Sequence, residues 1–145
     1  MPYIEDFLTS HEEEEIVEAI RVAEQETSGE IRVHIEQKCV SDVYERALEV
    51  FHLLKMDNTK DQNGVLIYVA VDNKSFVIFG DQGINNVVDA NFWNSTRDKI
   101  ATQFKSGSFK QGLINGVKEA GNVLAKYFPW KHGDRNELDN SISKG

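Results

Sequence analysis

Cysteine and long apolar runs are scarce in this sequence, and its charge is not basic. Cys39 is the single cysteine among 145 residues, so no internal disulfide can form and nothing indicates an oxidising compartment. No segment approaches the roughly 18 consecutive apolar residues of a membrane-spanning helix, and the N-terminus has no apolar signal-peptide core. We therefore expect a soluble, cytoplasmic protein that is not inserted directly into a membrane.

Acidic residues outnumber basic ones by 24 to 16, which gives a formal net charge of −8. A nucleic-acid partner would require a basic face to hold its phosphate backbone, so we expect none. The length and the hydrophobic fraction of 40% fit one domain with its own core. We place this domain at residues 10–130, between an N-terminal extension (1–9) and a polar, disordered tail (131–145), and expect a monomer.

The motifs of several enzyme classes are also absent. The sequence has no G-x-x-x-x-G-K-[ST] phosphate loop, no G-x-G-x-x-G after a strand and no G-x-S-x-G nucleophile elbow. One cysteine and scattered histidines argue against a zinc or iron–sulfur site. Residues 59–70 align with an EF-hand loop at Asp61 and Asn63, but Thr59 and Ala70 stand where its two defining carboxylates belong. An EF-hand is therefore excluded.

The first helix is predicted from a capping pattern. Ser10 followed by Glu13 is typical of a capping box, with Ser10 as the N-cap. The apolar spacing then continues to about Glu26, and we expect Gly29 to end the helix in a left-handed conformation.

Residues 30–36 alternate between apolar and polar side chains, which predicts a half-buried strand. His34 lies on the polar side, and we expect it at the surface. Residues 42–54 carry apolar side chains at helical spacing and predict a second helix.

The longest apolar run, residues 64–71, predicts a strand buried on both faces. Residues 75–79 predict a second strand that returns antiparallel to it. The strand at 30–36, the helix after it and the strand at 64–71 form a βαβ unit with parallel strands. We thus expect an α/β fold, a small mixed sheet flanked by about four helices. The last two of these are predicted at 92–106, capped by Asn91, and at 109–127, capped by Ser108.

Polar side chains gather at one edge of this predicted sheet. Parallel strands start at the same edge and the antiparallel strand ends there, so three segments meet and bring together Ser28, Glu30, Asp61, Asn63 and Asp81. Carboxylate and amide oxygens are ligands for hard cations such as Ca²⁺ or Mg²⁺, and Asp89 could reach in as a further ligand. The alternative is that these loops are ordinary turns, because Asp, Asn and Gly favour turns for conformational reasons.

Three short segments carry a resemblance to a known family. Ser28-Gly29-Glu30-Ile31, Asp61-Gln62-Asn63-Gly64-Val65-Leu66-Ile67 and Gly80-Asp81-Gln82-Gly83-Ile84 match the pattern S-G-E-[IL] … D-x-x-G-[VI]-L … G-x-G. Phe104 and residues 109–116 are similar to its F-x-x-G-x-[FY]-x-x-G-[LI] ending. Over residues 10–128 the sequence resembles the TPM domain family, named for a thylakoid-lumen phosphatase, a photosystem II repair protein and a modulator of levamisole receptors.

The resemblance implies a three-layer α/β/α sandwich with a divalent-cation site, often for calcium. By position, the implied ligands are Asp61, Asn63, Asp81 and Asp89, with Glu30 close by. It also implies acid phosphatase activity, in which Asp61 or Asp81 would act on a water molecule beside the cation, with a phosphate ester as substrate. The alternative is a non-catalytic assembly module whose bound cation holds the three loops together for a protein partner.

Overall fold

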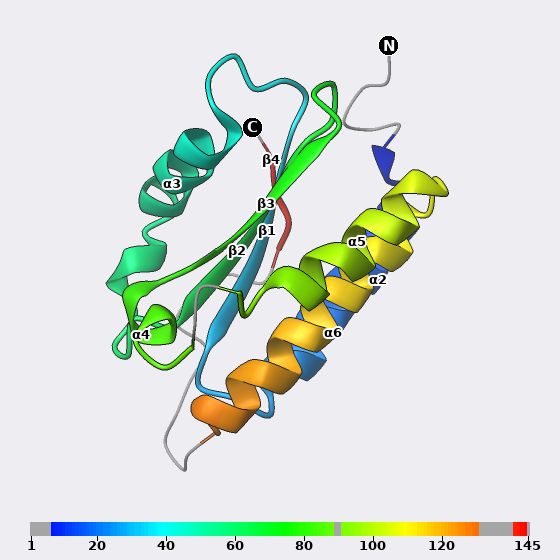
Figure 1. Cartoon of the computed structure of the whole chain (residues 1–145). Helices are drawn as coiled ribbons and strands as arrows, with labels where there is room; N and C mark the ends of the chain where they lie inside the picture. Colours follow the sequence, from blue (N-terminus) through cyan, green and yellow to red (C-terminus); the bar gives the residue numbers. More distant parts are fainter. Residues whose placement is uncertain (1–6, 89–90, 131–140, 145) are drawn as a thin grey trace.

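The computed structural model describes residues 7–88, 91–130 and 141–144, and it arranges them in three layers (Figure 1). A four-stranded sheet with the order β3-β2-β1-β4 forms the middle layer. Helices α2, α5 and α6 cover one face, and α3 covers the other (Figure 1). The predicted α/β sandwich with a mixed sheet is confirmed.

The strands are β1 (Glu30–Glu36), β2 (Gly64–Ala70), β3 (Ser75–Gly80) and β4 (Ser143–Lys144). Strands β1 and β2 are parallel, with Glu30 opposite Gly64 and Glu36 opposite Ala70. Strand β3 runs antiparallel to β2, with Gly80 opposite Val65. The βαβ unit and the returning strand are therefore as predicted, and Gly80 ends beside the start of β2.

The helices are α2 (Ser10–Glu24), α3 (Val43–Leu53), α4 (Gln82–Asn85), α5 (Asn94–Lys105) and α6 (Phe109–Tyr127), with a 3₁₀ turn at Met56–Asn58. Two predicted caps are wrong. The N-cap of α2 is Thr9, whose side chain accepts from the Glu12 amide while the Glu12 carboxylate accepts from the Thr9 amide. The capping box therefore lies one residue before the predicted pair. Trp93, and not Asn91, precedes α5.

Two hydrophobic cores fill the space on either side of the sheet. On one face, Ile31 and Val33 pack in a cluster that includes Ile20 of α2 and Val117 of α6. On the other face, side chains of β2 pack with side chains of α3, among them Phe51. Every residue of β2 is buried, as expected for a central strand covered on both faces.

Strand β1 is also buried on both faces, which corrects the expectation of a half-buried strand. His34 is 5% exposed and not a surface residue, because its ring stacks on Tyr68 of β2 and its Nδ1 lies against Ser143 of β4. Gly29 does not adopt a left-handed conformation. It allows close packing instead, since a Cβ there would lie 2.9 Å from Cδ1 of Leu124 in α6.

The ends of the chain take part in the fold beyond the predicted limits. Phe7 and Leu8, placed in the N-terminal extension by the sequence, are buried in the core beside α2 and α6. Residues 141–144, placed in the disordered tail, include β4. The remainder of that predicted tail, residues 131–140 and 145, lies outside the described residues. Among the described helices, none is long and apolar enough to cross a membrane.

Candidate functional site

The start of β1, the start of β2 and the end of β3 meet at one edge of the sheet. The Glu30 amide donates to the Asn63 carbonyl at 3.3 Å, and the Asp81 amide donates to the Gly64 carbonyl at 3.0 Å. These bonds tie the segments around Glu30, Asn63 and Asp81 together, as the strand directions predict.

The loops before β2 and after β3 fit tightly against each other. The Gly83 amide donates to the Gln62 carbonyl at 2.8 Å. A Cβ at Gly83 would lie 2.2 Å from the carbonyl oxygen of Asp61, so no larger residue fits without movement of the backbone. Gln62 adopts a positive φ of 51°, which turns the chain at this contact. The side chain of Asp61 is exposed beside it.

Asn63 and Asp81, at this edge, each have a buried side-chain oxygen atom without a hydrogen-bond partner among the described residues. Asn63 is 1% exposed, and its Nδ2 donates to the Ser28 hydroxyl at 3.3 Å, but its Oδ1 accepts nothing. Asp81 accepts from the Gln82 amide through Oδ1 at 2.7 Å, while its Oδ2 accepts nothing. Buried acceptors without donors cost free energy, and a hard cation takes oxygen ligands of these two kinds.

A second buried carboxylate lies next to Glu30, and the sequence prediction missed it. Glu24, in the last turn of α2, is 8% exposed and accepts from the Ile31 amide through Oε2 at 2.7 Å. Burial, and then the charge of Glu30, raise the pKa of the Glu24 carboxyl well above its usual value. The spacing of Ile16, Ile20 and Glu24 is the available signal, because Glu24 continues the buried stripe of the helix.

The structure thus brings together the backbones of Glu30, Asp61, Asn63 and Asp81. Within residues 7–88, 91–130 and 141–144, no three His, Cys, Asp or Glu side chains lie close enough to hold a metal ion between them. Asp89, the remaining predicted ligand, lies outside the described residues.

Comparison with known proteins decides the family. The family model of the TPM domain matches residues 4–123. This chain belongs to the TPM domain family. No curated protein matches it.

Solved structures agree with this TPM domain assignment. The NMR structure of the BA42 protein from the psychrophilic bacterium Bizionia argentinensis is 63% identical over all of both chains, with a TM-score of 0.93. The N-terminal domain of a protein from P. gingivalis is 20% identical, with a TM-score of 0.69 over 84% of this chain and 79% of that one. At 20% identity, the similarity to the P. gingivalis domain supports the fold and not a function.

This TPM domain also contains a buried ionic network, on the face of the sheet that α3 covers. It was not predicted from the sequence. Arg46 of α3 donates to both carboxylate oxygens of Glu36, and Tyr68 donates to Oε2 of Glu36 at 2.6 Å. His34 Nε2 lies 3.2 Å from Glu36 Oε1, an ion-pair distance without hydrogen-bond alignment. The His34 ring stacks on the Tyr68 ring, with centroids 5.8 Å apart.

The pKa values in this network favour a charged Glu36 beside a neutral His34. Burial alone would raise the pKa of Glu36, but hydrogen bonds from Arg46 and Tyr68 outweigh it and lower the pKa to about 2. Burial is also the largest influence on His34 and lowers its pKa. Because Arg46 and Tyr68 fill the space around the Glu36 carboxylate, we assign the network to holding α3 on the sheet.

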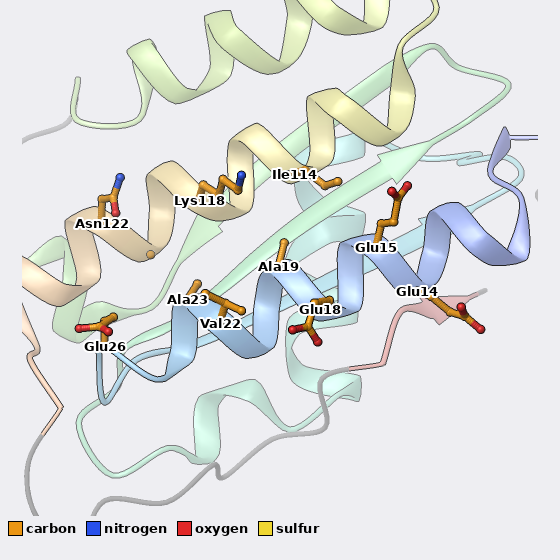
Figure 2. Close-up of a pocket in the computed structure, with 11 residues that line it drawn as sticks. Glu14, Glu15, Glu18, Ala19, Val22, Ala23, Glu26, Ile114, Lys118 and Asn122 are labelled. Carbon is orange, nitrogen blue, oxygen red and sulfur yellow. The ribbon is translucent and has the colours of Figure 1, made fainter.

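The TPM domain also has a groove of about 760 Å³ between α2 and α6, away from the sheet edge (Figure 2). Its apolar floor includes Ala19 and Ala23, and glutamates of α2 line its side (Figure 2). Glu15 pairs with Lys110 at 3.0 Å and Glu18 with Arg21 at 2.5 Å, so both carboxylates already form ion pairs with basic side chains. The sheet edge remains the better candidate for a cation site.

Proposed function

We propose that this TPM domain binds a divalent cation, Ca²⁺ or alternatively Mg²⁺, at the edge where β1 and β2 begin and β3 ends. The observation that carries the proposal is the buried amide oxygen of Asn63, which faces no donor among the described residues. Leaving such an acceptor unsatisfied costs about 1–3 kcal/mol, and a cation would remove that cost. A plain turn offers no such compensation.

The donor set fits a hard cation. Asn63 would contribute a neutral oxygen and Asp81 a negative one, because Asp81 Oδ2 is also without a donor among the described residues. Asp61 and Glu30 are further candidates, but their carboxylates do not converge with that of Asp81 among the described residues, so binding through them would require these side chains to turn toward the cation. We retain Asp89 as a ligand predicted by the family resemblance. Oxygen-only coordination of this kind is typical of Ca²⁺ and Mg²⁺.

Titration of the metal-stripped, ¹⁵N-labelled protein with Ca²⁺, and separately with Mg²⁺, tests this proposal. We expect amide shifts confined to residues around Glu30, Asn63 and Asp81. Asp81→Asn should weaken binding at least tenfold, whereas Asp98→Asn, on the exposed surface of α5, should leave it unchanged. An absence of shifts at this edge at millimolar cation would reject the site.

Phosphomonoester hydrolysis is the activity that the family resemblance adds to this site, and we propose it in addition to cation binding. The bound cation would supply Lewis-acid polarisation of a phosphoryl oxygen. Asp61 is exposed and Asp81 is half-buried, so either carboxylate could orient a water molecule and accept its proton. The sequence places one basic side chain, Lys60, beside these loops, which is few for a phosphate site.

The alternative is a non-catalytic module in which the cation holds the loops together, and the tight contact of Gly83 with the loop at Asp61 favours it. Hydrolysis of p-nitrophenyl phosphate, measured with and without Ca²⁺, separates the two. Cation-dependent turnover that Asp81→Asn abolishes would support catalysis. A rise in melting temperature with Ca²⁺ and no turnover above the blank would support the module.

We further propose that the protein is a cytoplasmic monomer whose partner is a phosphate ester or another protein. Its net charge of −8 supports the prediction that it does not bind nucleic acid. Light scattering of the purified protein and cell fractionation would test the oligomeric state and the location.

A further inference from the structure

The C-terminal strand β4 contacts the sheet as a short bound peptide would. Strand β2 pairs with all seven residues of β1, from Glu30 to Glu36, whereas β4 pairs with His34 and Ile35 alone. In Figure 1 β4 lies along β1 on the side away from β2. On that side, Ile31–Val33 have no neighbouring strand within the described part of the chain.

Each residue from Ile142 to Lys144 makes a specific side-chain contact. Ile142 packs against the hydrophobic core on the α2 side of the sheet. Ser143 Oγ lies 2.9 Å from His34 Nδ1. Lys144 Nζ lies 2.6 Å from Glu13 Oε1 of α2. The contacts therefore select an apolar residue, a small hydroxyl residue and a basic residue, in that order.

We propose that the outer edge of β1 is a docking site for an extended peptide of the pattern apolar–hydroxyl–basic, and that residues 141–144 are its resident, exchangeable occupant. The partner is a protein segment that adds itself to the sheet as a parallel strand. Exposed strand edges are sites for such additions, since main-chain hydrogen bonds give affinity and side-chain contacts give selectivity.

Exchange is feasible because the resident segment is weakly held. It pairs with two residues of β1. The ion pair between Lys144 and Glu13 is partly exposed, and exposed ion pairs contribute little to stability.

The backbone groups of successive residues point to opposite edges of a strand: the Glu30 amide bonds to the segment before β2, and the Ile31 amide bonds to Glu24 on the outer side. A longer partner strand could therefore add hydrogen bonds to Val33, whereas the backbone of Arg32 faces β2. Further extension would meet Glu24, which already accepts from the Ile31 amide.

The neighbours of the contact residues set the selectivity. His34 is buried and fixed between Glu36 and the Tyr68 ring, so the position opposite it suits a small hydroxyl side chain and not a large one. The basic position faces the carboxylate of Glu13, whose neighbours Glu12 and Glu14 are also acidic. An acidic residue at that position of the peptide would be repelled.

The test uses the full-length chain and a synthetic peptide with the sequence of residues 137–145. The substitutions I142D and K144E together should release the resident segment, so the amide resonances of Val33–Glu36 shift from their wild-type positions. Millimolar peptide should return them toward those positions. The wild-type chain should respond to the peptide at least fivefold more weakly, because its own segment competes.

A charge exchange provides the matched control. A peptide carrying Glu in place of Lys144 should not bind the released chain, but should bind a chain that also carries E13K. The preference of the chain for Lys or Glu in the peptide reverses only if residue 13 contacts that position of the peptide. The NMR spectrum of each variant verifies that it is folded. Unchanged β1 resonances in the released chain, or no response to either peptide at millimolar concentration, would overturn the proposal.

Discussion

Glu24→Gln is expected to stabilise the protein at alkaline pH and to leave its stability nearly unchanged at acidic pH. Glu24 is buried beside Glu30, and its pKa is raised by burial and by the Glu30 charge. A glutamine can still accept from the Ile31 amide, as Glu24 Oε2 does at 2.7 Å, and it carries no charge at any pH. The variant therefore removes the titration and keeps the hydrogen bond.

The sign follows from proton linkage. Because the folded-state pKa lies above the unfolded value, the contribution of protonated Glu24 is fully present below the unfolded pKa of 4.5 and is lost as the pH rises through the folded pKa. In that window one bound proton changes the free energy of unfolding by about 1.4 kcal/mol per pH unit. From pH 6 to pH 8 the wild-type chain should thus lose at most about 2.7 kcal/mol relative to the variant.

Thermal unfolding at pH 5, 6, 7 and 8, in the presence of a chelator, measures this effect. A difference of about 2.7 kcal/mol corresponds to roughly 5–10 °C in a domain of this size. Glu14→Gln, at an exposed position of the same helix, is the matched control and should follow the wild-type pH dependence. The reasoning is refuted if Glu24→Gln and the wild-type chain lose stability in parallel between pH 6 and pH 8.

Three further features of the fold can be tested by substitution and thermal or denaturant unfolding. Thr9→Ala should cost about 1 kcal/mol by removing the N-cap, while Ser10→Ala should cost much less, and the reverse order would contradict the observed capping box. Arg46→Ala should cost about 3 kcal/mol at pH 7 by leaving Glu36 buried without its main partner. That cost should shrink as the pH falls below the unfolded pKa of 4.5 toward the folded pKa of about 2, because the wild-type chain then loses the stabilisation by the charged Glu36 carboxylate. Gly83→Ala should cost about 1–3 kcal/mol, since its Cβ would overlap a backbone carbonyl, and a change below 0.5 kcal/mol would contradict the tight loop contact.

The strands could be predicted because their patterns are local. Alternation over residues 30–36 and the apolar run from residue 64 both give the observed strands, and the turn at Asp72 gives the antiparallel return. The strand directions then bring Glu30, Asn63 and Asp81 to one edge without further information. The metal, the activity and the ligand roles of these residues stay predictions.

The features that were missed depend on contacts between distant segments. Residues 30–36 look half-buried because alternation cannot reveal that Tyr68, Ser143 and Arg46 cover their polar side chains. A usable signal was present, since Tyr68 lies in a strand predicted to be buried on both faces, and a buried tyrosine needs a partner for its hydroxyl. The observed parallel register sets His34 opposite Tyr68. Strand β4 carries no signal, because two residues of a polar segment show no periodicity.

The burial of β2 has a consequence for the chain before it folds. Gly64–Ala70 is seven residues long, uncharged, free of proline and rich in β-branched and aromatic side chains. Segments of this composition form cross-β aggregates when they are exposed. Charged residues lie on both sides of the segment, Lys60 and Asp61 before it and Asp72 and Lys74 after it, where they act as gatekeepers that discourage stacking. The central strand that unites the two cores is therefore also the segment from which aggregation should begin when the protein is heated or translated slowly.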